Sequence, residues 1–557
     1  ITNSSSTGYQ YYAQRYSMTD DFPFAEINVF QLGLYAQDKW TVSDKLNLTL
    51  GLRIDVPFFM TDLQSNDKVA AETYRDGIKI DVSKYPNAKP QFSPRFGFNY
   101  KPFDDENGSL QIRGGTGLFT GTPPYVWISN QAGNNGVLFG DLNVRAVKDK
   151  NDNIISDGRP SLGFTGNMDT YKPAEGSATR SDIAITDPDF KYPSLWKSNI
   201  AADYKFGDGW VATVELLYSK DINAIYHDNI GLYRTEQFVN DGGAGNARPY
   251  YNGYYSDREG NQKAANHVVM LRNTSKGHSL YTTFQLQKNF VDGILKGLYL
   301  NGSYSFGQSR GVTDGTSSVA TSAWKYRAAL DGNAEEVGYT AGSFDGRLLL
   351  SASYTANWSK YAATSFGLIY QRYRPFRYSY CYNGDANGDS QFSNDLMYIP
   401  ANFDEVKDHL LPGDFDSQED AWKAMNAFIE QDPYLSKHRG EYAERNGAVA
   451  PFANQLDLSV SHDIKSYQKN GRSHTLRFSF NIANFLNLLN RNWGVVQTTV
   501  LGNQQYQFLT IPKGQGPSAA NNYTLKYTMA KDLDETFKDN LNDVSRWQMQ
   551  FGIKYIF

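Results

Sequence analysis

The feature that most constrains this 557-residue sequence is an alternation of apolar and polar residues that returns along the chain. In LNLTLGLRID, every second residue is apolar: Leu46, Leu48, Leu50, Leu52 and Ile54. Because successive side chains of a β-strand point to opposite faces, this period predicts a strand with one apolar face. The same period recurs at 196–206, 210–219, 280–290, 298–306, 348–358, 456–464, 476–482 and 547–557.

The length of these runs and of their connections points to a membrane barrel. Many runs span about ten residues, which a tilted strand needs to cross a bilayer, whereas an ordinary soluble strand has ~5–6. Short connections lie at 41–45, 102–108, 207–209, 291–297, 359–362 and 466–472; long ones lie at roughly 56–91, 120–194, 220–278, 308–345, 374–452 and 484–545. Short periplasmic turns and long extracellular loops are typical of an all-β, antiparallel transmembrane barrel of the bacterial outer membrane.

Composition narrows the alternatives. No segment approaches the ~18 consecutive apolar residues of a membrane helix. The net charge of −5 does not suggest a nucleic-acid partner. Alternation alone would also fit a soluble barrel or sandwich. Strand length, the Asn, Gln, Ser, Thr and Gly of the polar faces, and aromatics at the short-turn ends favour outer-membrane lipid; the aromatics are Trp40, Tyr100, Phe206, Trp210, Phe290, Trp358 and Phe557.

Arginines indicate which face lines the barrel interior. Arg on a lipid-facing position near the midplane costs ~2–4 kcal/mol. The interior-facing set is Arg53, Arg95, Arg113, Arg347 and Arg477. Two roles stay open for this set: guidance of an anionic substrate, or pairing with acids of a plug domain. We favour pairing, because charges inside membrane proteins usually find partners.

The strand count predicts an incomplete barrel. Six short hairpins hold about twelve strands, and 547–557 adds a thirteenth, whereas such barrels usually have an even number. The first strand, near 30–40, and the last both run toward the short turns, so they cannot close an antiparallel sheet together. We therefore expect further strands upstream of Ile1, with residues 1–557 forming the carboxyl-terminal part of a larger barrel.

Several segments resemble the TonB-dependent outer-membrane transporters, specifically the Oar-like branch of Bacteroidetes. They are FQLGLYAQDKWTVSDKLNLTLGLRID (30–55), FSPRFGFNY (92–100), IRGGTGLFTGTPPYVWISNQAGNNG (112–136), DPDFKYPSLWKSN (187–199), NGDANGDSQFSNDLMYIP (383–400) and NFLNLLNRNWG (484–494). The resemblance spans essentially the whole chain. It implies a 22-stranded barrel, an amino-terminal plug and a periplasmic TonB box, although neither plug nor TonB box is recognisable here. A surface lipoprotein is a further candidate partner.

The segment DANGDSQFSND is a candidate calcium loop. Its oxygen-bearing residues are Asp385, Asn387, Asp389, Gln391, Ser393 and Asp395. Ligands at alternate positions of a glycine-containing loop are how EF-hand-type loops wrap calcium. Ser390 replaces the usual turn glycine, and Asp395 falls one position short of the closing acid. The alternative is a metal-free surface loop rich in Asx turns.

Two other loop features have open interpretations. Residues 414–432 predict an amphipathic helix, capped by Asp416 or Ser417. We expect its apolar face to pack within its own loop rather than to bind a partner. The Tyr-rich segments 248–262 and 370–384 are either recognition surfaces or aromatics of a loop core.

The last strand ends in Tyr555 and Phe557, which resemble the signal by which the barrel-assembly machinery recognises its clients. No motif for catalysis stands out: the seven His are scattered, and GGTGLFTG (114–121) lacks the Lys-Ser/Thr of a phosphate loop. We therefore expect no enzyme. Three functions remain: TonB-energised import through a plugged barrel, adhesion through the loops, and passive diffusion through a porin.

Overall fold

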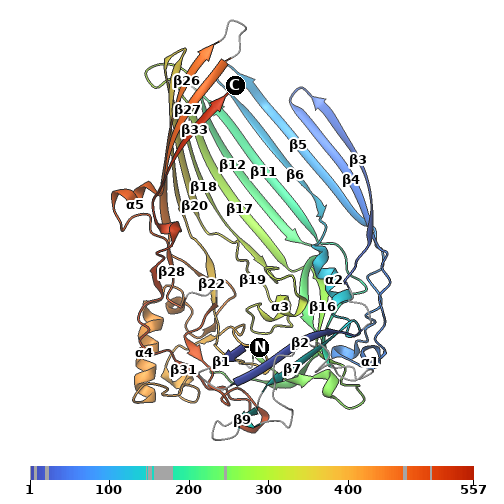
Figure 1. Ribbon diagram of the computed structural model, residues 1–557. Helices are drawn as coiled ribbons and strands as arrows, with labels where there is room; N and C mark the ends of the chain where they lie inside the picture. The colour runs from blue at the N-terminus through green and yellow to red at the C-terminus, as the bar shows by residue number, and fades with distance from the viewer. Residues whose placement is uncertain are drawn as a thin grey trace.

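The computed structural model describes residues 2–4, 9–18, 24–145, 147–148, 154–155, 180–207, 209–243, 247–467, 473–501 and 505–557. Its largest element is a curved antiparallel sheet in which thirteen long strands follow one another in sequence order (Figure 1). The strands are β3 (Val29–Ser43), β4 (Leu46–Phe59), β5 (Gln91–Asp105), β6 (Gly108–Thr120), β11 (Ser194–Phe206), β12 (Trp210–Asp221), β17 (Gly277–Asn289), β18 (Leu298–Gly311), β20 (Arg347–Ser359), β21 (Ala362–Tyr373), β26 (Ala453–Tyr467), β27 (Ser473–Ala483) and β33 (Gln548–Ile556). The short β19 (Gly338–Tyr339) pairs with the end of β18.

The predicted fold class, the thirteen strands and the alternation of short and long connections are confirmed. The described short turns lie at one end of the sheet and the described parts of the long connections at the other, as Figure 1 shows. Two boundaries are wrong: β3 continues to Ser43 within the predicted connection 41–45, and residues 102–108 are not all connection. A register shift between Tyr100 and Phe103 lets β5 stay paired with β6 as far as Asp105 and Gly108.

The register gives the sheet one apolar and one polar face. Phe480 lies opposite Phe551, and Phe478 lies opposite Ile553, so apolar side chains continue from β27 to β33. Phe551 is 78% exposed, an exposure that suits a lipid-facing position. On the polar face, short side chains are linked across strands, as in the 2.8 Å hydrogen bond that Gln285 donates to Asn301.

The two edge strands of the sheet run in the same direction. Each strand is antiparallel to the next over the thirteen-strand path, so β3 and β33 are parallel. Within the described residues, β3 pairs with β4 and β33 pairs with β27, and neither has a second partner. This is the parity that the sequence predicts.

The long connections fold into a layer of small sheets, which we call the loop layer. Its paired strands are β10 (Ser181–Thr186), β16 (Ala265–Thr274) and β13 (Ala224–Asn229); β14 (Leu232–Phe238) and β15 (Pro249–Tyr254); β25 (Ala448–Val449), β22 (Arg377–Tyr380) and β29 (Gln505–Tyr506); β23 (Tyr398–Ile399) and β24 (Glu441–Tyr442); β28 (Gln497–Thr499) and β32 (Phe537–Asp539); β30 (Leu509–Thr510) and β31 (Thr528–Met529). Residues near the start of the chain add β1 (Thr2–Ser4) and β2 (Tyr9–Ser17), of which β2 pairs with β7 (Phe139–Arg145), while β8 (Val147–Lys148) pairs with β9 (Ile154–Ile155).

The helices of the described chain are short and lie in the connections. They are α1 (Asp67–Ala71), α2 (Tyr125–Gly133), α3 (Ala320–Lys325), α4 (Gln418–Gln431) and α5 (Phe485–Leu489), with 3-10 turns η1 (Arg75–Gly77), η2 (Tyr255–Asp257), η3 (Phe403–Glu405), η4 (Leu435–Lys437), η5 (Ala519–Asn521) and η6 (Asp543–Ser545). None of the described helices has the length and apolarity that crossing a membrane would require.

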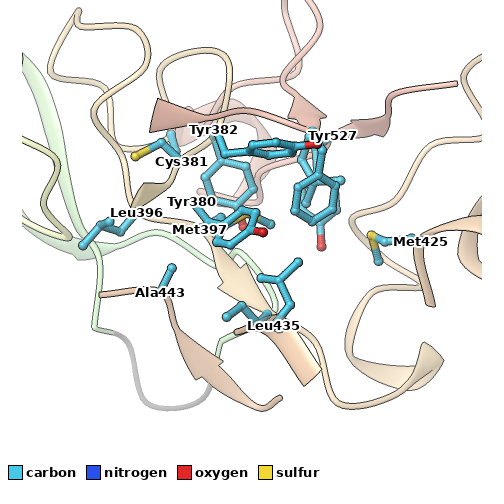
Figure 2. Packing of buried hydrophobic residues seen from close by; sticks show 14 of the residues in the cluster. Tyr380, Cys381, Tyr382, Leu396, Met397, Met425, Leu435, Ala443 and Tyr527 are labelled. Carbon is cyan, nitrogen blue, oxygen red and sulfur yellow. The ribbon is translucent and has the colours of Figure 1, made fainter. Parts of the chain in front are cut away.

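The largest buried cluster of the molecule lies in the loop layer. Tyr380, Tyr382, Met397 and Met425 are fully buried there, and Figure 2 shows their side chains packed around a common centre with Tyr527. Segments from several long loops contribute to this core, which is therefore built as in a soluble domain.

Helix α4 confirms the predicted amphipathic helix. Ser417 caps it by accepting a hydrogen bond from the backbone N–H of Asp420. Its buried face includes Met425 and Phe428. The expectation that this face packs within its own loop is too narrow, because Phe428 contacts Phe508 of the 484–547 connection at 4.9 Å between ring centroids.

Candidate functional site

The five predicted interior arginines lie on the polar face of the sheet. Three form ion pairs with carboxylates of the strands themselves. Arg53 pairs with Asp55 at 2.7 Å, Arg113 with Asp203 at 2.9 Å and Arg477 with Asp463 at 2.6 Å. The structure thus gives these three arginines partners within the sheet, and the preferred interpretation, pairing with acids of a plug domain, stays a prediction. The strands supply the counter-charges at positions that the pleat places on the same face.

The other two arginines have neutral neighbours. Arg95 lies over the Phe119 ring, 4.7 Å from its centroid. Arg347 donates a 3.4 Å hydrogen bond to the side-chain oxygen of Gln371. A role of the whole set toward a substrate or a plug stays a prediction.

The carboxylates of the acidic loop bind the loop's own backbone. Asp385 accepts hydrogen bonds from the N–H groups of Gly388 at 2.6 Å and Ser390 at 2.8 Å. Asp389 accepts one from Gln391 at 2.8 Å. The bond between Asp389 and Gln391, and the one that Asn387 accepts from the N–H of Asp389 at 2.9 Å, join residues two apart and are the Asx turns of the alternative interpretation. Within the described residues, no three His, Cys, Asp or Glu side chains are grouped as metal ligands.

Electrostatics nevertheless set this loop apart from a solvated turn. Burial raises the pKa of Asp389 well above its ordinary value, and the charges of Asp395 and Asp385 raise it further. Burial also raises the pKa of Asp395 to about 7, against the opposing effect of Arg248. Ser393 borders a cavity on one side of the loop. Calcium at Asp385, Asn387, Asp389, Ser393 and Asp395 stays a prediction.

Arg248 is the centre of a fully buried charge network that the sequence analysis missed. Its guanidinium contacts Asp241 at 2.8 Å and Asp395 at 3.1 Å, and all three side chains are almost completely buried. The rings of Tyr382 and Tyr442 lie 5.6 Å from the guanidinium carbon. Burial lowers the pKa of Arg248, but the two carboxylates more than reverse that effect, so the pKa is raised. This network joins two long loops.

The Tyr-rich segments belong mainly to the loop core. Tyr251, Tyr378, Tyr380 and Tyr382 are buried, so a recognition role for these side chains is wrong. The Tyr380 hydroxyl donates a 2.6 Å hydrogen bond to Asp432. These large aromatic side chains fill the interior of the loop layer, as aromatic residues do in the core of a soluble domain.

A cavity of about 500 Å³ lies in the loop layer between α3, β22 and β29. Two buried arginines, Arg327 and Arg445, line it together with the exposed aromatics Tyr326 and Phe392. No sequence signal singled out these residues, since Tyr326 and Arg327 are adjacent in one connection whereas Phe392 and Arg445 lie far apart in another. They come together only when the loops fold.

On the last strand, the Tyr555 hydroxyl lies 2.6 Å from Nδ1 of His474, and the Tyr555 ring stacks on that of Phe557. Phe557 is 90% exposed. The assembly role of Tyr555 and Phe557 stays a prediction.

Comparison with solved structures finds similarity to outer-membrane receptors and transporters at low identity. Solved structures with similarity include the siderophore receptor PirA from Acinetobacter baumannii (8% identity, TM-score 0.39, 86% of this chain and 47% of that one). Others are the copper transporter OprC (9%, 0.37, 82% and 42%) and a mutant of the ferric enterobactin receptor PfeA from Pseudomonas aeruginosa (9%, 0.39, 98% and 50%). The chain thus spans about half the length of these structures.

No curated protein matches the sequence. A family model described as an outer membrane beta barrel domain matches residues 7–517, which is most of the chain. The two-faced sheet, its exposed apolar band and its short-turn and long-loop ends agree with that match. The chain belongs to the outer membrane beta-barrel domain family and is a protein of the bacterial outer membrane.

Proposed function

We propose that this chain is the carboxyl-terminal part of a TonB-dependent receptor that imports a ligand across the outer membrane. The observation that carries this proposal is the sheet of thirteen strands whose two edges run in the same direction. Such a sheet needs an odd number of further strands to close as an antiparallel barrel. Nine upstream strands would complete the 22 that the Oar-like resemblance implies.

The loop layer supports a receptor rather than a passive pore. A porin needs an open path for solutes, whereas these loops enclose a core that includes Tyr380, Tyr382 and Met425. A folded layer of this kind presents fixed surfaces and cavities that bind a ligand selectively. The proposal includes an upstream plug, TonB, the barrel-assembly machinery and outer-membrane lipid as partners, and it assigns no enzymatic activity.

The test uses the full-length protein and a variant lacking its upstream periplasmic segment. We expect the full-length protein to bind the periplasmic domain of TonB in a pull-down assay and the shortened variant to lose that binding. In planar bilayers, the full-length protein should show little steady conductance. TonB binding that does not depend on the upstream segment, or a large ohmic conductance, would contradict the proposal.

Adhesion through the loops is the second candidate. In that case the loops bind a partner at the cell surface, and that binding does not need TonB. Removing TonB from cells would then leave their adhesion unchanged.

A further inference from the structure

Three arginines of the loop layer are buried without a carboxylate partner. Arg327, Arg377 and Arg445 are 6%, 8% and 3% exposed. Arg327 donates to the carbonyl oxygens of Val312, Gly332 and Ala334. Arg445 donates to those of Gly311, Val312 and Gly338, and Arg377 to those of Ser343 and Asn446. None of their hydrogen bonds in the described part of the chain reaches an acidic side chain.

These contacts leave the guanidinium groups incompletely satisfied. The Nε atoms of Arg327 and Arg445 are buried and have no hydrogen-bond acceptor among the described residues. The two arginines also share the carbonyl of Val312, so two positive charges lie close together. Carbonyl oxygens orient a guanidinium but do not neutralise it. An uncompensated buried charge is costly unless another group supplies the opposite charge.

The two acids whose charges act on Arg445, Asp314 and Glu336, are already engaged with other groups. Asp314 accepts hydrogen bonds from the backbone of Ala341 and from Asn446, at 2.8 and 3.0 Å. Glu336 accepts from the backbone of Leu330 at 2.9 Å. Burial and the charge of Arg327 lower the pKa of Arg445 to about 10, and Asp314 and Glu336 oppose that shift only in part. Arg445 is therefore still charged at neutral pH.

Both Arg327 and Arg445 line the cavity of about 500 Å³. A cavity of this volume accommodates a small organic molecule. Its lining includes Thr316, Ser393 and two aromatic residues, Tyr326 and Phe392. Tyr326 is 58% exposed and Phe392 is 67% exposed, so their rings are accessible to a ligand. The wall thus combines two arginines and exposed aromatic surface with one carboxylate, that of Asp314, which accepts hydrogen bonds from Ala341 and Asn446.

The cavity adjoins a second one toward the sheet. Thr313 and Asp314 border both, and the second cavity, of about 550 Å³, reaches the strand ends at Phe119, Leu195 and Asp221. The arginine-lined cavity is therefore close to the end of the barrel sheet rather than on a distant loop tip.

We propose that the cavity between α3, β22 and β29 binds a small organic anion, a carboxylate or phosphate ester that carries an apolar ring. The anionic group lies near Arg327 and Arg445, and the ring packs against Tyr326 and Phe392. This inference deepens the proposed function by naming a ligand class for the receptor, and it rests on that function only for the ligand's later transport.

The first experiment compares three probes on the full-length protein in detergent by calorimetry. Benzoate carries the charge and the ring, benzamide has the ring without the charge, and inorganic phosphate has the charge without the ring. We expect benzoate to bind about tenfold or more tightly than either of the others. Equal binding of benzoate and benzamide would overturn the anion assignment, and equal binding of benzoate and phosphate would overturn the ring contact.

The second experiment locates the site. Arg445→Gln and Arg327→Gln should each weaken benzoate binding about tenfold. Arg439→Gln is the matched control for Arg445→Gln, because Arg439 lies in the same loop as Arg445 and does not line the cavity. Unchanged binding in both cavity variants would overturn the proposal. If either variant fails to fold, the comparison of benzoate with benzamide on the unaltered protein still decides it.

These measurements need no TonB, so they separate the two proposals. A protein that binds TonB but shows no preference for benzoate would overturn the ligand class and leave the receptor function standing. A protein that prefers benzoate but does not bind TonB would do the reverse.

Discussion

Large apolar side chains are exposed on the outer face of the barrel strands but buried in the loop layer. On the sheet, Phe551 and Ile553 are exposed on the outer face, and polar residues occupy the other face. In the loops, Tyr380, Tyr382 and Phe508 are fully buried. The strands therefore depend on lipid to cover their apolar side chains, while the loop layer covers its own.

Charges differ between the two regions in the same way. Arg477 on strand β27 has one partner, Asp463, and remains 42% exposed. Arg248 in the loop layer is fully buried and has two carboxylate partners. A wet polar face tolerates a simple pair, whereas a buried arginine needs its charge balanced.

The largest effect is expected where the loop layer holds its buried charges. Arg248→Met leaves Asp241 and Asp395 buried without their cation, which should lower the free energy of unfolding by about 3–5 kcal/mol. Amide exchange across 374–452 should accelerate, while the barrel strands stay protected. Arg439→Met, which removes a partly exposed arginine of the 374–452 loop, should have a much smaller effect. Similar exchange in both variants would mean that the network contributes nothing to stability.

A smaller effect is expected on the lipid face. Phe478→Arg should cost about 2–4 kcal/mol if residue 478 lies near the midplane, because a charge then enters hydrocarbon. Ser479→Arg, one residue further and on the polar face, should cost less. The check is unfolding by denaturant in lipid vesicles. Equal costs for the two changes would refute the assignment of faces.

Sequence periodicity predicts the sheet well and the loop layer poorly, for physical reasons. In 46–54 the alternation of Leu with polar residues is local, so it predicts the strand and the side chains on each of its faces. Arg248 and Asp395 are 147 residues apart, and Arg113 and Asp203 are 90 apart. No local pattern joins such pairs. The prediction of helix α4 is confirmed because a capping residue and an apolar stripe are also local signals.

The smallest effect concerns the acidic loop. If calcium binds at Asp385, Asn387 and Asp389, an ion bound only by the folded loop stabilises it by mass action. A chelator should then speed amide exchange across 380–400 and leave the strands unchanged. Asp385→Ala combined with Asp389→Ala should reproduce the chelated state. Exchange that neither treatment changes would leave the spacing as turn chemistry alone.

Spin labelling can show whether the sheet has one face toward lipid and one face toward water. Cys381 is the single cysteine and is buried, so Cys381→Ala gives a background for one new cysteine at a time. Labels placed from 476 to 482 in β27 would be compared for collision with oxygen, which enters lipid, and with a water-soluble nickel complex. The account predicts oxygen contact at 476, 478 and 480 and nickel contact at 477, 479 and 481. Accessibility without this period of two, or with the two probes exchanged, would contradict it.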